Sequence, residues 1–494
     1  MHFNIKKLSK KVPKSAKPKA LPRIPGQKII FRLPILISIA IILILCIGIV
    51  KALSNLDMSV FLEIAGNDLQ EDAYGHTNFL ILGTADDENE GTFLTDTMIV
   101  ASLDPEKKLV TMVSIPRDYY VHSDEMDYLK INEIYLYAKV YFGNSTEALE
   151  HLKSKVEEIT GIPIHYWALI NFQGFKDLID ALGGVDVEVK NDIYDPYYPK
   201  DGTVYYETFK ISAGLHHMDG ETALKFARSR QTTSDFDRAG RQQQLIYAMK
   251  EKALSTEVLL SSAKIKNILT ALKSNIETNI TVKEILTMGS MAKNFSEDNL
   301  LHRLIHDDPN NCGGLVYTPM REFYNNKFVL IPAGDEEYIH RYTDLSLNHP
   351  EIAKEKSRIH VLNGTETPGI AGETKQILRR YCFEVNRFGN GRALNLTQTT
   401  YFYKQKYDEK GNPVPSRPVA LDFLTKIIPG VESTEIPEEY KEYMLETDII
   451  LEIGSDYTTS PNYIDDPFYY LPDPYIPKKA VETTVETPEA NANQ

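Results

Sequence analysis

One uninterrupted apolar run, residues 33–50, constrains the chain more than any other feature of its sequence. The run reads LPILISIAIILILCIGIV, contains no charged residue and is about as long as a helix that spans a bilayer. Ten Lys and Arg residues precede it, from Lys6 to Arg32, and no Asp or Glu lies among them. Because basic flanks stay on the cytoplasmic side, we predict a single membrane anchor, with the N-terminus inside the cell and the chain after Lys51 exported.

Two other interpretations of this run are a cleaved signal peptide and a buried core helix. The apolar stretch is longer than the roughly 7–15 residues of a signal-peptide core, and the basic leader before it is long. We therefore predict an uncleaved anchor at residues 33–51, with residues 1–32 as a basic cytoplasmic leader and residues 52–76 as a juxtamembrane linker.

Length, charge and cysteine usage narrow the class of protein. With 494 residues the chain is long enough for two or three domains. After Lys51 it holds 43 Lys and Arg against 69 Asp and Glu, so its charge argues against nucleic acid as a partner. Outside the anchor only Cys312 and Cys382 remain, too few and too far apart for a disulfide framework or a zinc site. We therefore predict two unpaired structural cysteines.

Three β-branched runs predict strands near the start of the exported part: TNFLILGT from Thr77, TDTMIVASL from Thr95 and KLVTMVSIPRD from Lys108. The turn-forming residues DPEKK between the second and third runs predict a hairpin. Asp96 would then begin one strand of the hairpin, and Arg117 would end the other.

Helical periodicity follows these strands. STEALEHLKSKVEEITG predicts a helix with Ser145 as N-cap and Gly161 as its stop, and FQGFKDLIDALGG from Phe172 predicts a second helix. A strand is expected from Val185, and Asp219 is expected to cap a helix through ETALKFAR. This alternation of helices and strands predicts a layered α/β domain.

The rest of the chain divides into an extension, a second domain and a tail. Residues 255–308 keep a helical pattern and extend the first domain, which we place at residues 77–344. A linker at residues 345–357 leads to a small α/β domain at residues 358–457, with the order strand, Gly-rich turn, helix and strand. The tail, residues 458–494, is rich in Pro, Tyr and acidic residues and is predicted to be disordered.

Four arginines gather within one stretch, FARSRQTTSDFDRAGRQQQ, at the end of one predicted helix and the start of the next. They are Arg228, Arg230, Arg238 and Arg241. Because guanidinium groups grip phosphate oxygens with two donors and stay charged, a converging set implies a multiply charged ligand such as a pyrophosphate. The alternative is that three of them, Arg228, Arg230 and Arg238, pair on the surface with nearby acids: Asp235, Asp237 and Glu221.

Two acidic residues could add a metal to such a site. Mg²⁺ binds phosphates while held by one or two carboxylates, and Asp96 and Asp86 are candidates. Asp86 lies in the loop GTADDENEG, and loop carboxylates are more often simply solvated, so both interpretations stay open on the residues alone.

Seven motifs occur in order between residues 77 and 254: FLILGTAD, TDTMIVASL, SIPRDYYV, KIN, NFQGFKDLIDALGGVDV, ALKFARSR and DFDRAGRQQQ. Together they resemble the catalytic domain of the LytR-CpsA-Psr family. Residues 358–457, with HVLNGTETPGIAG and DIILEIGSDY, resemble the LytR C-terminal domain. The resemblance implies a layered α/β/α catalytic domain with a central mixed sheet, followed by a small α/β domain.

This resemblance implies an enzyme that moves a glycopolymer from a polyprenyl-pyrophosphate carrier to an envelope acceptor, commonly the muramic acid hydroxyl of peptidoglycan, and forms a phosphodiester. It implies Mg²⁺ held by Asp96 and Asp86, and Asp96 and Arg117 as catalytic residues. The implied pyrophosphate-binding residues are Arg117, Lys130, Arg228, Arg230, Arg238 and Gln242. Asn132 of the KIN motif would line the same pocket.

Two positions depart from the family pattern. The family places an Asp two residues after the glycine that ends the first strand, whereas here Asp86 comes three residues after Gly83, so Asp86 or Asp87 would have to compensate. Glu133 follows the KIN motif where the family often has His. The general base stays unassigned among three candidates: Asp96, Asp118 and Asp235.

Other functions are consistent with parts of the sequence. A polyprenyl-pyrophosphate phosphatase or pyrophosphatase would release the phosphate to water, and a non-catalytic scaffold is allowed by the altered GTADD loop. The exported bulk and its charge argue against a transcriptional regulator. The second domain has no catalytic cluster and is expected to bind or position a ligand. Five apolar residues could line a lipid cleft or simply form core: Trp167, Phe172, Phe175, Leu178 and Ile179.

Overall fold

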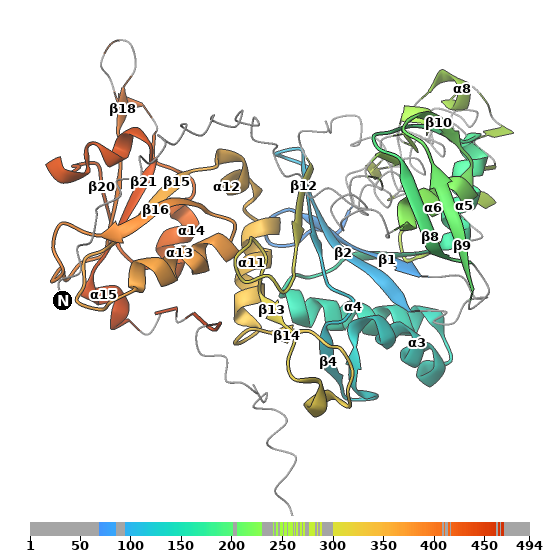
Figure 1. Cartoon of the computed structure of the whole chain (residues 1–494), viewed down its shortest axis with the longest axis horizontal. Coiled ribbons are helices and arrows are strands. Elements are labelled where there is room, and N and C mark those ends of the chain that lie inside the picture. Colours follow the sequence, from blue (N-terminus) through green and yellow to red (C-terminus); the bar gives the residue numbers. More distant parts are fainter. Residues whose placement is uncertain are drawn as a thin grey trace, which may run out of the picture.

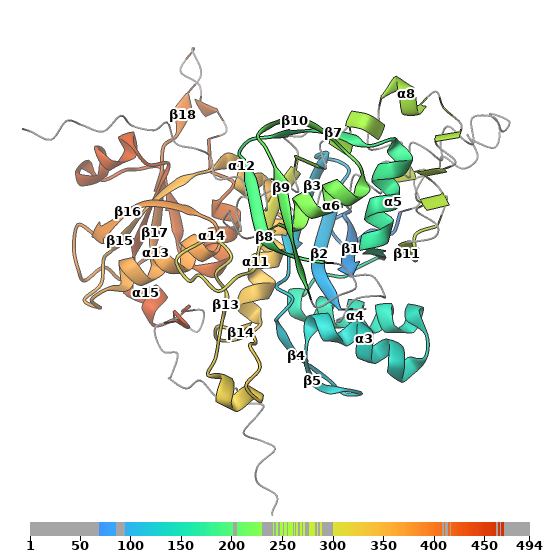
Figure 2. The same ribbon diagram turned by 45° about the vertical axis from the view of Figure 1, so that its right-hand side comes forward.

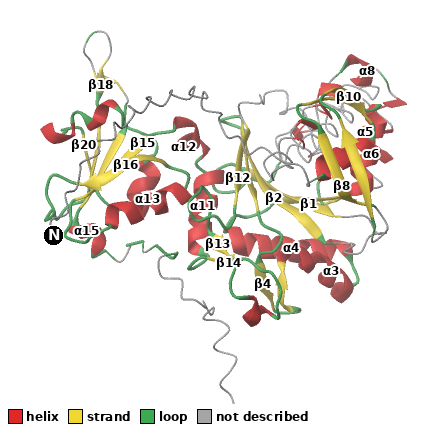
Figure 3. Ribbon diagram, in the orientation of Figure 1, coloured by secondary structure: helices red, strands yellow, loops and turns green. Residues whose placement is uncertain are grey.

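The computed structural model describes residues 69–84, 94–200, 205–229, 300–407 and 416–460, with shorter runs within 241–288, 410–414 and 463–468. Two α/β domains lie side by side, one built on the sheet that contains β1 and β2 and the other on the sheet that contains β15 and β21 (Figure 1, Figure 3). The predicted anchor lies outside the described residues. Among the residues that are described, no helix has both the length and the apolar character needed to cross a membrane.

The first domain is built on a six-stranded mixed sheet with the order β11-β6-β1-β2-β3-β12. Four strands run parallel to one another: β1 (Thr77–Thr84), β3 (Leu109–Ser114), β6 (Tyr166–Asn171) and β12 (Leu300–Leu304). Two run the opposite way: β2 (Thr95–Asp104) and β11 (Ile276–Thr278). The three strands predicted from β-branched runs and the β2–β3 hairpin are therefore confirmed.

At one edge of this sheet several strand ends lie close together. Strands β1, β3 and β6 end there and β2 begins there, because Thr84 pairs with both Thr95 and Asn171, and Ile99 pairs with Ser114. We call it the carboxyl edge of the first sheet. In α/β folds, ligands bind beyond such edges, where loops and helix starts converge.

Helices cover the sheet and define two cores. Helices α3 (Ile131–Phe142) and α4 (Ser145–Thr160) lie below the sheet in Figures 1 and 2 and pack on Leu80, Leu82 and Val100. The second core includes residues from these elements: α5 (Phe172–Leu182), α6 (Gly220–Arg228), β7 (Val185–Val189), β8 (Ile193–Pro199), β9 (Tyr206–Ile211) and β10 (Gly214–Met218). The expected layered α/β arrangement is confirmed.

Helix α4 shows why the local pattern was informative. The predicted apolar face is buried along its whole length, and Gly161 ends the helix in the left-handed conformation at φ 68°. The N-cap differs by one residue from the prediction. Asn144, not Ser145, has the extended backbone of a cap, and its Oδ1 accepts a hydrogen bond from the Thr146 N–H at 2.8 Å.

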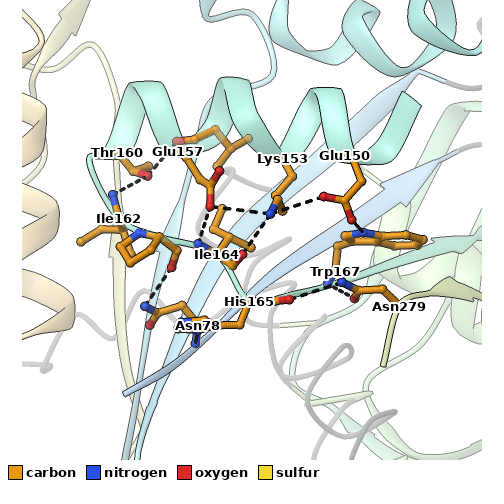
Figure 4. Close-up of polar contacts among 12 residues, drawn as sticks. Asn78, Glu150, Lys153, Glu157, Thr160, Ile162, Ile164, His165, Trp167 and Asn279 are labelled. Carbon is orange, nitrogen blue, oxygen red and sulfur yellow. Dashed lines mark hydrogen bonds and ion pairs between the residues drawn. The ribbon is translucent and has the colours of Figure 1, made fainter. Parts of the chain in front are cut away.

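Polar contacts fasten α4 to β6 and to the segment before it (Figure 4). Trp167 of β6 donates its indole N–H to Glu150 at 2.6 Å, and its backbone N–H donates to Asn279, next to β11, at 2.8 Å. Lys153 donates to the Ile164 carbonyl at 3.3 Å. Trp167 is therefore a core residue. Phe175, Leu178 and Ile179 are likewise buried, in the second core.

The expected helical extension of the first domain is only partly helical. Residues 255–308 include the short helix α8 (Thr256–Leu259), but also β11 and β12, which occupy the two edges of the central sheet. The helical pattern expected for this segment is therefore wrong where β11 and β12 lie. These short strands form because Ile276 and Leu300 find partners in β6 and β3, more than 100 residues away in the sequence.

The second domain is a smaller α/β unit, as predicted. Its sheet has the order β16-β15-β21-β17-β20. The strands are β15 (Arg358–Asn363), β16 (Glu384–Asn390), β17 (Thr400–Tyr403), β20 (Val431–Ser433) and β21 (Ile449–Ile453). Helices α13 (Ile370–Arg380) and α14 (Leu421–Ile427) contribute their apolar faces to the core of this unit.

The two domains are covalently joined. Cys312, in the loop after β12, forms a disulfide with Cys382, just beyond α13, with their Cα atoms 4.5 Å apart. The prediction of unpaired cysteines is therefore wrong. A separation of 70 residues gave no sign that the two loops meet, but the Gly313 N–H also donates to the Arg380 carbonyl at 2.9 Å, so the backbones lie against each other.

The expected linker and the beginning of the expected disordered tail are ordered. Residues 345–357 contain the end of α11 (Glu337–Leu347) and α12 (Pro350–Glu355), and Leu345, Leu347 and Ile352 are buried. The polar residues that suggested a linker lie on the outer faces of these helices. In the tail, Asp466 forms a buried bidentate ion pair with Arg380, with N–O distances of 2.6 and 2.9 Å. Residues 469–494 lie outside the described part of the chain.

Candidate functional site

The carboxyl edge of the first sheet brings Asp96 and Arg117 together. Asp96 is the second residue of β2, and Arg117 comes three residues after β3. Arg117 Nη1 lies 3.1 Å from Asp96 Oδ1, and the Asn132 amide donates to the same oxygen at 3.2 Å. The side chains of Arg117 and Asp96 remain 42% and 45% exposed, so both are accessible to a ligand.

A second pair of charges extends this contact. Lys130 Nζ lies 2.7 Å from Asp118 Oδ1, and Arg117 Nε lies 3.6 Å from Asp118 Oδ2. The hairpin of β4 (Tyr120–Ser123) and β5 (Asp127–Lys130) makes this possible, because Lys130 pairs with Tyr120 and so returns to the start of the hairpin. We call Asp96, Arg117, Asp118 and Lys130 the charge network. Positive and negative side chains alternate in this network, so each carboxylate is paired with at least one basic side chain.

The first turn of α3 fixes Asn132 behind the charge network. Asn132 is buried, its N–H donates to the Arg117 carbonyl at 3.3 Å, and its carbonyl accepts the Thr95 hydroxyl at 3.4 Å. Glu133 accepts the Lys130 N–H at 2.9 Å and pairs with Lys327 at 3.4 Å. Glu133, which departs from the family pattern, therefore caps α3 and forms an ion pair with Lys327 of a later loop.

Arg228 lies at the end of α6, whose predicted cap Asp219 is confirmed by a 2.8 Å hydrogen bond from the Thr222 N–H. Its guanidinium carbon lies 4.4 Å from the ring centre of Phe172, the first residue of α5. It also lies 5.5 Å from the ring centre of Tyr198. Because α5 begins directly after β6, Arg228 is held beside the carboxyl edge.

Arg241 has a structural role. It is buried, and its guanidinium donates to the Phe226 carbonyl at 2.8 Å and to the Ser229 carbonyl. The Ser229 hydroxyl in turn donates to the buried Asp195 at 2.8 Å. Neither Asp195 nor Ser229 was singled out from the sequence. An acidic residue at an inward position of a strand is the signal that could have found Asp195.

Several predicted site residues lie outside the described part of the chain. They are Asp86, Arg230, Arg238 and Gln242, together with Asp87 and Asp235. Of the predicted residues that are described, the charge network unites Asp96, Arg117 and Lys130. Arg228 lies apart from them at the end of α6, where its guanidinium contacts Phe172.

The donor set at Asp96 fits a hard cation such as Mg²⁺. Within the described residues, the recorded contacts of the Asp96 carboxylate are made by Oδ1, and the buried Asn132 Oδ1 has no hydrogen-bond partner. Mg²⁺ takes oxygen ligands and needs only one or two carboxylates because it keeps several waters. No group of three or more His, Cys, Asp or Glu side chains is gathered in the described residues, so a closed metal cage is not formed by these residues alone.

Comparison with known proteins places this geometry in a family. Residues 54–323 match the LytR_cpsA_psr family, and residues 356–457 match the LytR cell envelope-related transcriptional attenuator domain.

Individual relatives are similar to parts of the chain. Over 245 residues the chain is 31% identical to the polyisoprenyl-teichoic acid–peptidoglycan teichoic acid transferase TagU of Bacillus mycoides, covering 49% of this chain and 72% of that protein. Over 362 residues it is 26% identical to the cell wall biosynthesis protein LcpA of Corynebacterium glutamicum, covering 66% of each chain. A crystal structure of TagV from B. subtilis is 29% identical, with a TM-score of 0.40, and covers 55% of this chain and 97% of TagV. The chain therefore belongs to the LytR_cpsA_psr family and carries a LytR C-terminal domain after its family domain.

Proposed function

We propose that the protein is a membrane-anchored phosphotransferase. It moves a glycopolymer from a polyprenyl-pyrophosphate carrier to a cell-envelope acceptor such as peptidoglycan and forms a phosphodiester. Family membership supports this proposal, as does the transferase TagU among its relatives. The observation that carries it is the charge network, in which the exposed Asp96 and the largely buried Asp118 hold Arg117 and Lys130 side by side at the carboxyl edge.

The exposure of the charge network explains how an anion could enter it. Ion pairs in contact with water contribute only about 0–1 kcal/mol, so a diphosphate can replace the Arg117–Asp96 contact at little cost. Arg117 and Lys130 would then bind the pyrophosphate of the donor. Arg228 would contact it from the end of α6, beside Phe172 at the start of α5, and Arg230, Arg238 and Gln242 complete the proposed set.

The reaction needs an in-line displacement at the phosphorus that carries the sugar. The acceptor hydroxyl forms a new P–O bond, the bridging P–O bond of the pyrophosphate breaks, and polyprenyl phosphate leaves. Phosphoryl transfer depends mainly on positioning and on neutralising charge, which fixed guanidinium and ammonium groups can supply. The acceptor proton would pass to a carboxylate, for which Asp96, Asp118 and Asp235 remain the candidates.

Asp96 and Asp86, with Asn132 behind Asp96, would hold Mg²⁺ in this proposal. When bound, Mg²⁺ would supply additional positive charge at the phosphate oxygens. Asn132 would keep Asp96 in place through its 3.2 Å hydrogen bond, independently of the metal.

We also propose that the chain is a single-pass membrane protein with its bulk outside the cell. The apolar run and its basic leader support this proposal. A lipid-linked donor would then lie in the same membrane as the enzyme.

Product analysis tests the proposed function. The full chain in detergent would be incubated with Mg²⁺, a polyprenyl-pyrophosphate-linked saccharide and peptidoglycan fragments, and the products identified by mass spectrometry. A saccharide phosphate attached to the acceptor is the expected result. Free sugar phosphate, formed at the same rate with and without acceptor, would instead identify a hydrolase, and donor binding without turnover would identify a scaffold.

A further inference from the structure

A two-stranded ribbon beside Arg228 carries an unusual outer face. Strands β8 and β9 pair antiparallel, with an irregularity in the register between Asp195 and Tyr198. On either side of it the side chains alternate between a buried and an exposed face, and Tyr197 lies on the exposed face. The inner face is buried: Ile193, Tyr198 and Phe209 belong to the second core. Because this face packs on the domain, the opposite face points away from it.

The outer face is aromatic. Tyr194, Tyr197 and Tyr206 are 49%, 59% and 65% exposed. The rings of Tyr197 and Tyr206 meet edge to face, with centres 6.1 Å apart, and Lys210 lies 4.8 Å from the ring centre of Tyr194. We call this set of three tyrosines and Lys210 the tyrosine face. Large aromatic side chains exposed together on one face of a ribbon are a feature of interaction surfaces.

Asp195 connects the tyrosine face to the arginine segment. Its Oδ1 accepts the Tyr197 N–H at 3.1 Å, and its Oδ2 accepts the Ser229 hydroxyl at 2.8 Å. Tyr198, the next residue, lies under the Arg228 guanidinium on the inner side of the ribbon. The ribbon is thus fixed directly to the segment that presents Arg228.

The chemistry of the tyrosine face matches a saccharide chain. A sugar ring has an apolar C–H face and a rim of hydroxyl groups, and a tyrosine offers an apolar ring with a polar hydroxyl beside it. A lipid surface suits this face less well. Among the described residues of β8 and β9, no Leu, Val, Phe or Trp points outward, and the acidic excess after Lys51 opposes anionic lipid.

We propose that the tyrosine face binds the glycan of the donor, several sugars away from its pyrophosphate. This inference rests on the proposed function and adds to it an element that would discriminate among donor polymers. The donor is favoured over the acceptor because its sugars are covalently joined to the pyrophosphate, and the ribbon is fixed to Arg228.

The test compares two donors on the full chain in detergent. One donor carries a long glycan and the other a single saccharide unit. The variant is Tyr194→Ala/Tyr197→Ala/Tyr206→Ala, and the matched control is Tyr137→Ala/Tyr141→Ala, which removes two exposed tyrosines from α3. We expect the KM for the long donor to rise about tenfold or more in the ribbon variant, because each aromatic contact contributes to binding. Its kcat, its KM for the short donor and all values of the control should stay unchanged.

Three outcomes would overturn the inference. An unchanged KM for the long donor removes any role in glycan binding. An equal rise for both donors assigns the tyrosines to the structure of the arginine segment instead. The third uses the variant Tyr197→Trp in nanodiscs that contain brominated phosphatidylglycerol. If the bromine quenches the fluorescence of the new tryptophan, the tyrosine face lies in lipid.

A binding arm separates this inference from the proposed function. Anisotropy of the labelled glycan, freed from its lipid, is measured with the wild type and the ribbon variant. If the wild type transfers nothing yet binds this glycan through the three tyrosines, the proposed transferase fails and glycan recognition stands. In the opposite case the wild type transfers the glycopolymer, neither the wild type nor the ribbon variant binds the free glycan, and the two proteins have the same KM for the long donor. The transferase then stands and the inference fails.

Discussion

The two domains use the carboxyl edges of their sheets in opposite ways. In the first domain that edge is open, with Arg117 and Asp96 both more than 40% exposed. In the second domain the corresponding edge is closed by its own hydrogen bonds. Asn363, the last residue of β15, is buried, and its side chain accepts from the Thr365 N–H at 2.8 Å and donates to the Thr367 carbonyl at 2.9 Å.

Charge at the second edge is also satisfied internally. Glu452 is fully buried, accepts the Tyr440 hydroxyl and pairs with Arg392 at 3.3 Å. Burial, followed by the hydrogen bond to Glu452, raises the pKa of Tyr440. A charged group that is buried and paired cannot bind a ligand without losing its partner, and leaving a buried charge unpaired is costly. The contrast teaches that two similar α/β sheets differ in what their carboxyl edges offer: the first keeps accessible charged groups there, and the second keeps its groups paired and buried.

Removing Arg117 is expected to have the largest effect. Arg117→Ala should lower kcat/KM for transfer by about 10²–10³-fold, because a fixed donor to the developing charge is lost. The matched control is Arg387→Ala, which removes an exposed arginine of the second domain that pairs with Glu446. Steady-state kinetics with intact folding by circular dichroism provides the measurement. An equal loss of kcat/KM in Arg117→Ala and Arg387→Ala would contradict the proposed difference between the two edges.

Breaking the disulfide tests whether the second domain is a fixed partner of the first. Cys312→Ser/Cys382→Ser should lower the free energy of unfolding by about 2–4 kcal/mol, because the bond closes a loop across the domain junction. Denaturant unfolding of the full chain in detergent gives this number. Transfer at a temperature where the variant is folded should be unchanged. A large loss of kcat in the folded variant would mean that the second domain shapes the open edge.

Lys130 should contribute less than Arg117. Lys130→Met is expected to lower kcat/KM by about 10–100-fold, the loss of one charge-assisted hydrogen bond to the donor. Lys404→Met is the matched control, since Lys404 of the second domain donates to the Met444 carbonyl at 2.7 Å. If Lys130→Met retains full activity, Lys130 serves only to hold Asp118, and its place among the pyrophosphate ligands is wrong.

Glu133 should affect stability alone. Glu133→Ala removes the acceptor of the Lys130 N–H and should cost about 0.5–2 kcal/mol of stability, the usual effect of losing a helix cap. Glu133→Gln keeps an acceptor and should cost less. The two are compared by thermal unfolding. A drop in donor affinity with Glu133→Gln would instead show that the Glu133–Lys327 pair takes part in binding.

The sequence could predict those elements whose patterns are local. The β-branched runs of β1 to β3 and the apolar face of α4 carry their own periodicity, and both are confirmed. Strands β11 and β12 are short, and each exists only because a distant strand offers it a pairing edge. The Cys312–Cys382 bond likewise depends on the docking of two domains, which no local pattern encodes.

The site was predictable to a similar degree. The hairpin of β2 and β3 was expected to carry Asp96 at its start and Arg117 at its end, and the two side chains do meet. The contact of Lys130 with Asp118 was not expected, because it needs the β4–β5 hairpin. Arg241 was grouped with the other arginines by its charge alone, whereas burial assigns its donors to backbone carbonyls.

The most direct test of the central claim is a crystal structure of the protein with a non-hydrolysable pyrophosphate analogue of the donor and Mg²⁺. We predict that the diphosphate lies at the carboxyl edge of the first sheet, within hydrogen-bonding distance of Arg117 and Lys130, with the Arg117–Asp96 contact replaced. A diphosphate bound at the second domain, or at any site that leaves the charge network intact, would contradict the account.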